Sequence, residues 1–80
     1  MSERSTLADG VAHEAESLVR MANQIASNAA FQPHEVAVAQ VAAHLRDFWH
    51  PSMRAGLTAY VDGGGTGLDP LPREALDRLR

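Results

Sequence analysis

The side chains of this sequence that best suit a metal ion are its four histidines, His13, His34, His44 and His50. No two of them stand four residues apart, the spacing that places two ligands on one helix face, and there is no cysteine. His44 and His50 are six residues apart, so a helix through both would hold them on different faces. The spacing argues against a structural metal site. His44 is better explained as a partly buried or interface residue, and a role as a pH switch stays open.

A second candidate for chemistry is the glycine-rich stretch at residues 63–67, which reads Gly-Gly-Gly-Thr-Gly. A phosphate-binding loop of this kind follows a strand and supplies a lysine. Here the stretch follows a helical pattern, and the sequence has no lysine at all. The glycines are better explained as a helix end and a flexible linker, with Gly63 as a left-handed cap.

Nucleophilic or acid–base catalysis has little support in the sequence. Ser17, Ser27 and Ser52 occupy helix-surface or cap positions and have no evident general base. Paired carboxylates are absent from the apolar faces, because Asp47 falls on the polar side of its predicted helix. We therefore expect no catalysis by this chain alone.

Size and composition narrow the class of protein further. Eighty residues make one domain that buries only about 60% of the surface of the unfolded chain, and much of the apolar content is alanine. The net charge of −3 argues against nucleic acid as a partner. No apolar run approaches the ~20 residues of a membrane span, and the N-terminus lacks the pattern of a signal peptide. These features predict a cytoplasmic protein stabilised by binding to a partner.

Apolar residues recur every three or four positions along most of the chain, which predicts helices and no strands. We expect an all-α fold, a small bundle of three to four short helices, with a flexible N-terminus over 1–9 and one helical domain over 10–80. Prolines and glycines divide the pattern into its helices. The predicted helices run from about Asp9 to Asn28, from Pro33 to Trp49, from Pro51 to Asp62 and from Pro70 to Arg80. Gly56 weakens the third helix, which suggests close approach of another backbone there.

The largest side chains gather where the second predicted helix ends. Phe48 and Trp49 are followed by His50, and the next residue, Pro51, disfavours helical angles at His50. Adjacent residues point about 100° apart on a helix, so one aromatic ring can fill the core while the other faces a partner. The residues that we expect to form the interface are His44, Phe48, Trp49, Met53 and Arg54.

Three blocks of the sequence resemble the delta subunit family of NAD-dependent formate dehydrogenase. They are residues 18–26 (LVRMANQIA), residues 41–54 (VAAHLRDFWHPSMR) and residues 67–76 (GLDPLPREAL). The sequence departs from the family pattern at three positions: Ser52 stands where Arg is common, His50 where an acid is common, and Pro72 where an aliphatic residue is common. The departures leave the helix–break–helix arrangement undisturbed.

The resemblance implies a noncatalytic accessory subunit that docks on the catalytic alpha subunit and supports assembly or stability of a cytoplasmic complex. That complex oxidises formate at a molybdenum or tungsten pterin and passes electrons through iron–sulfur clusters and FMN to NAD. This chain has no cysteine to hold a cluster, so we expect it to bind none of these cofactors. Two alternatives are an independent helical adaptor or transcriptional regulator, and a metal-dependent enzyme.

Overall fold

The computed structural model describes the backbone of residues 2–80 and the side chains of residues 14–80. Within residues 2–80 the chain forms α-helices and no strand, as predicted. The helices are α1 (Ser2–Ala29), α2 (His34–Phe48), α3 (Pro51–Asp62) and α4 (Pro70–Arg78).

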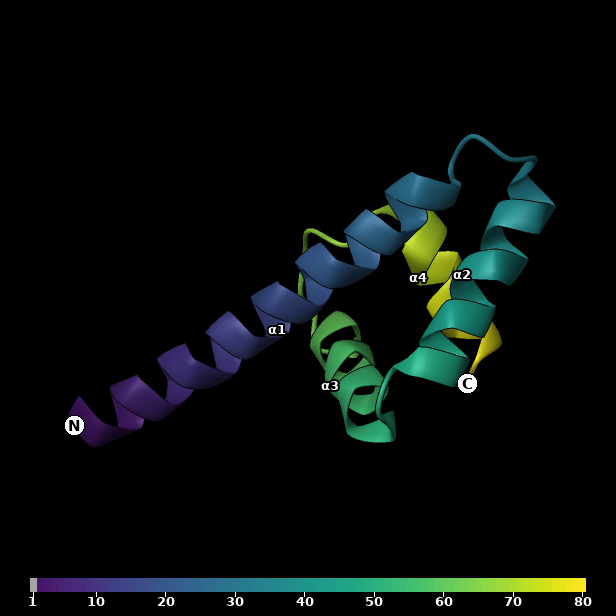
Figure 1. Cartoon of the computed structure of the whole chain (residues 1–80). Helices are drawn as coiled ribbons and strands as arrows, with labels where there is room; N and C mark the ends of the chain where they lie inside the picture. Colours follow the sequence, from purple (N-terminus) through teal and green to yellow (C-terminus); the bar gives the residue numbers. More distant parts are fainter. Residues whose placement is uncertain (1) are drawn as a thin grey trace.

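Helix α1 is longer than the sequence indicated. It begins at Ser2 rather than near Asp9 and ends at Ala29, so it has 28 residues. Gly10 does not interrupt it, since one glycine inside a helix costs only about 1 kcal/mol relative to alanine. The flexibility of residues 1–9 stays a prediction, and Met1 lies outside the described residues. The first half of α1 extends beyond the other three helices, and the molecule measures 49 × 20 × 18 Å (Figure 1).

Proline fixes the start of α2 and α3. Pro33 is the N-cap of α2, and its carbonyl oxygen accepts a hydrogen bond of 2.9 Å from the Ala37 amide. Pro51 is the first residue of α3, where its missing N–H is not needed.

The end of α3 differs from the prediction. Gly63 was predicted to be a left-handed cap, but its φ is −80°, and the left-handed backbone falls at the next residue, Gly64, with φ of 90°.

Helix α1 is the central packing element of the bundle, because each of the other three helices packs against it. Helix α4 also packs along α2 and lies between α1 and α2, while α3 crosses beside α1 (Figure 1). Gly56 allows the close approach of α3. A Cβ atom there would lie 3.3 Å from Leu18 Cδ1, so the nearby group is a side chain of α1 rather than its backbone.

The core consists mostly of aliphatic side chains from α2, α3 and α4 packed on α1, which contributes Leu18, Val19 and several alanines, and Trp49, directly after α2, joins it. Leu45, Leu57 and Leu76 are fully buried. Helix α1 contributes Ala22, which is also fully buried, together with other alanines. The small alanine side chains let α1 lie close to the neighbouring helices. They also bury little apolar surface, so the apolar area inside the domain is limited.

One asparagine fixes the linker before α4. The Asn23 side chain donates a hydrogen bond of 2.9 Å to the Gly67 carbonyl oxygen and accepts one of 2.9 Å from the Asp69 amide. Asp69 is the N-cap of α4, but its own side chain makes no capping hydrogen bond. Asn23 on α1 therefore positions the start of α4 across the bundle.

Candidate docking surface

The corner between α2 and α3 separates the two adjacent aromatic residues. Helix α2 ends at Phe48, and both Trp49 and His50 have extended backbone angles, with ψ of 137° and 141°. This extended pair turns the chain and rotates Trp49 inward. Trp49 is 6% exposed and belongs to the core, whereas Phe48 is 76% exposed. The corner therefore places one ring in the domain and the other on its surface.

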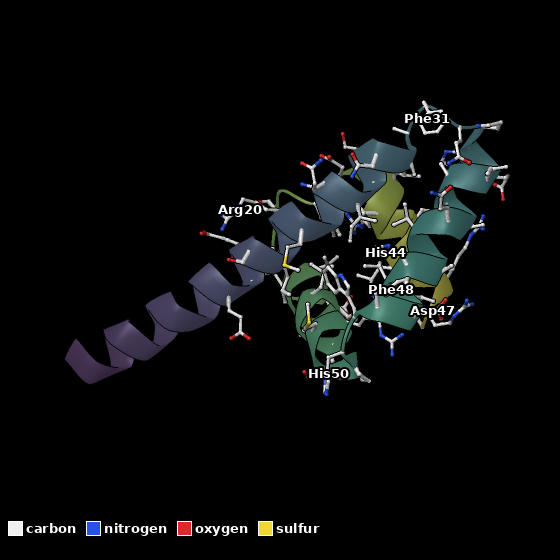
Figure 2. The ribbon with its side chains drawn as sticks, in the orientation of Figure 1. Arg20, Phe31, His44, Asp47, Phe48 and His50 are labelled. Atoms are coloured by element: carbon white, nitrogen blue, oxygen red, sulfur yellow. The ribbon has the colours of Figure 1, made fainter. Side chains whose placement is uncertain are left out.

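Phe48 lies beside His44, one helical turn earlier on α2 and also exposed. Their ring centroids are 5.0 Å apart and the planes are inclined by 40°. Figure 2 shows both rings on the same side of α2. Since residues four apart are neighbours on a helix surface, the two rings interact within α2 itself. This interaction does not depend on α1 or α4.

A hollow of about 130 Å³ opens between α1 and α2 next to this ring pair. Its lining residues are Ile25, Asn28, Ala29, Gln40, Val41 and His44. None of them carries a formal charge when His44 is neutral. Met21, which is 45% exposed, lies one turn before Ile25 on α1 and extends the apolar surface. We refer to the six lining residues as the α1–α2 hollow.

Met53 and Arg54 serve the corner itself. Met53 is half-buried and packs against the core. Arg54 is also half-buried, and its Nη1 donates a long hydrogen bond of 3.5 Å to the Arg46 carbonyl oxygen in the last turn of α2. The carbonyl groups of a last helical turn lack partners within their helix, so the guanidinium satisfies one of them. Of the five residues predicted for the interface, His44 and Phe48 are the exposed ones.

His50 has a role that the sequence did not reveal, because it caps α3. Its Nδ1 accepts a hydrogen bond of 3.1 Å from the Ser52 amide, and the Ser52 hydroxyl lies 2.8 Å from the same nitrogen. The usual N-cap residues are Asp, Asn, Ser and Thr, so a histidine gives no signal of capping in a sequence. Capping also explains why an acidic residue suits this position.

Replacing His50 with alanine is expected to lower the free energy of unfolding by about 1 kcal/mol, since one amide of the first turn of α3 loses its acceptor. His50→Asp is expected to match or exceed the wild type, because a carboxylate accepts the same bond and favours the positive end of the helix dipole. Urea unfolding followed by circular dichroism measures both. Ser52→Ala is the control, as it keeps the backbone donor. Equal stability of His50→Ala and the wild type would contradict the cap.

Several charged side chains of the described residues pair on the outer surface, away from the α1–α2 hollow. Arg78 Nη2 lies 2.7 Å from Glu35 Oε2, which ties α4 to the first turn of α2, and this hydrogen bond lowers the pKa of Glu35. Arg80 forms an ion pair of 2.6 Å with Asp62 and likewise lowers the pKa of that carboxyl through its hydrogen bond. None of these four residues lines the hollow.

Asp47 lies on the exposed side of α2, as predicted, and the hydrogen bond from Arg46 lowers its pKa.

No polar or charged side chain is buried among residues 14–80. Within the same residues, no three His, Asp or Glu side chains gather as a metal ion requires. His34 instead contacts Glu74 at 2.6 Å, and the side chain of His13 lies outside the described residues. The described side chains therefore do not fit an iron–sulfur cluster or another metal centre.

The described part of the chain contains no helix that is both long and apolar enough to cross a membrane. Over that part, the fold and the surface define a small all-helical protein with an open apolar hollow and an exposed aromatic pair.

The family model of the NADH-dependent formate dehydrogenase delta subunit, FdsD, matches residues 17–76. The match covers most of the chain, and the chain belongs to this family. Membership implies association with a formate dehydrogenase complex. The matched residues include all of α2 and α3, the hollow and most of α4. No curated protein and no solved structure matches the chain significantly.

Proposed function

We propose that this chain is a noncatalytic accessory subunit of a cytoplasmic, NAD-dependent formate dehydrogenase that contains molybdenum or tungsten. It docks on the catalytic alpha subunit and, through it, on the other subunits, and it supports assembly or stability of the complex. The observation that carries the proposal is the aromatic pair of His44 and Phe48. It leaves a phenylalanine 76% exposed beside an apolar hollow in a chain of the delta subunit family.

The composition of the core supports a role that depends on binding. A domain of 80 residues with an alanine-rich central helix has a limited apolar interior, and a partner that binds only the folded form stabilises it by mass action. The pterin, iron–sulfur clusters and FMN belong to other subunits in this proposal. The chain has no cysteine, and its role is to bind protein rather than to carry electrons.

Deleting this chain is expected to lower formate-dependent NAD reduction by the remaining subunits several-fold, because they assemble incompletely or lose cofactor. The assay compares the purified complexes by NADH formation, by metal and flavin content, and by mass on a sizing column. Re-expression of the chain is the control and is expected to restore all three. Full activity with full cofactor content in its absence would contradict the proposal.

A further inference from the structure

The α1–α2 hollow has the dimensions of one side chain. A cavity of roughly 150 Å³ lined by aliphatic groups holds a molecule as large as benzene. The hollow is somewhat smaller, at about 130 Å³, and its deepest lining is formed by aliphatic residues of two helices. Val41 and Ala29 are almost fully buried, and Ile25 packs against the core. The size therefore suits one leucine, isoleucine or methionine side chain.

The charge of the hollow points to the same class of occupant. Two of its three polar members, Asn28 and Gln40, already have side-chain partners within the chain, and the third, His44, has its ring against Phe48. Asn28 accepts from Gln24 at 3.4 Å, and Gln40 accepts from Gln32. No acidic residue lines the hollow, so a buried Lys or Arg would find no opposite charge there, and a carboxylate would find one only in a protonated His44; burial of an unpaired charge is costly. An uncharged apolar side chain brings no polar group of its own that would need a partner there.

The neighbouring rings indicate how the occupant is presented. His44 lines the hollow and Phe48 follows one turn later, with 5.0 Å between ring centroids. Side chains four residues apart on a second helix are separated by about 6 Å along its axis, a similar step. A helix laid along α2 can therefore insert one side chain into the hollow and place the next against Phe48, as in helix-in-groove recognition.

We propose that the α1–α2 hollow receives a single aliphatic side chain from an amphipathic helix of another subunit of the formate dehydrogenase complex. This inference rests on the proposed function and adds the place and chemistry of the contact. The occupant lies between Ile25 and Val41 and is covered on one side by His44, while the next side chain of the partner helix lies against Phe48.

The test introduces a negative charge at neighbouring positions in the same helical turn. Asn28→Glu places a carboxylate on the rim of the hollow, while Ser27→Glu places the same charge one residue earlier, on an exposed site that does not line it. Both positions lie at the end of α1, so the two variants share any penalty from the helix dipole. On the opposite wall, Gln40→Glu and the exposed Ala39→Glu form a second matched pair.

Binding of the full chain to the purified complex of the other subunits is measured by interferometry. Asn28→Glu and Gln40→Glu are expected to weaken binding at least about tenfold, since a carboxylate is left unpaired at a desolvated contact. Ser27→Glu and Ala39→Glu are expected to bind like the wild type. A photo-crosslinking residue at position 28 is expected to capture an apolar helical segment of another subunit.

The outcomes separate this inference from the proposed function. Failure of the wild-type chain to bind the complex would overturn the proposed function itself. Binding by the wild type with equal binding within each matched pair would leave that function standing and overturn the assignment of the hollow. Crosslinks from position 28 to a second copy of this chain, or to a charged loop, would also overturn it. If the Asn28→Glu variant loses helicity, the comparison of Gln40→Glu with Ala39→Glu decides whether the hollow is the contact.

Discussion

Replacing Trp49 with alanine is expected to unfold much of this protein at moderate temperature. The ring is 6% exposed and belongs to the same core as Leu45 and Leu57. Truncation of a buried tryptophan costs about 3–5 kcal/mol. At roughly 0.05–0.15 kcal/mol per residue, 80 residues supply only about 4–12 kcal/mol in total. The midpoint of thermal unfolding should therefore fall by more than about 12 °C.

Circular dichroism during heating measures the midpoint for the wild type and for Trp49→Ala. Trp49→Phe is the matched control, because it keeps an aromatic ring in the corner and should lose much less stability. The single tryptophan gives a second readout, since a buried indole has blue-shifted fluorescence that shifts to the red on unfolding. A Trp49→Ala variant with the stability of the wild type and weaker binding would instead make Trp49 an interface residue.

Most helix boundaries could be predicted because they are set by single residues that act locally. Pro33, Pro51 and Pro70 each fix a helix start within one residue, since proline restricts its own φ and lacks an amide donor. The same rule explains the corner after Phe48. The start of α1 was not predictable in this way, because residues 2–9 offer several possible N-caps of the Ser, Thr and Asp types and no proline to select among them.

Contacts between distant segments escaped prediction. Asn23 belongs to the polar side of α1 in the sequence pattern, but its amide fixes Gly67 and Asp69, more than forty positions away. Arg78, in the last turn of α4, forms an ion pair with Glu35 of α2, which lies 43 positions away. Such partners depend on the packing of whole helices, which periodicity alone does not determine.

Two residues that the sequence singled out, His44 and Phe48, form the exposed aromatic pair, but the orientation of the two aromatic residues at the corner was not predictable. Spacing indicated that one of Phe48 and Trp49 can face the core while the other faces a partner, and the 100° step between them fits either assignment. The extended backbone of Trp49 and His50 decides it, since it turns the indole under α2 and leaves Phe48 outside. The hollow was also invisible in the sequence, because α1 and α2 form its two walls.

Replacing Phe48 with serine is expected to leave the fold intact and to weaken binding to the formate dehydrogenase complex by about thirtyfold. The side chain is 76% exposed, so its removal takes little apolar surface from the core. An aromatic anchor at the centre of an interface contributes about 2 kcal/mol or more, which corresponds to about thirtyfold in the dissociation constant. Co-purification with the other subunits and interferometry both measure the effect.

Phe31→Ser is the matched control for this experiment. Phe31 is 84% exposed in the turn between α1 and α2, and Figure 2 shows it at the opposite end of α2 from Phe48. The two variants make the same substitution at rings of similar exposure, so a difference in binding between them reports the location of the ring rather than its hydrophobicity. Weaker binding only in Phe31→Ser would move the docking surface to the turn. Unchanged binding in both variants would show that neither Phe48 nor Phe31 is covered by the partner, and the docking surface would then lie elsewhere.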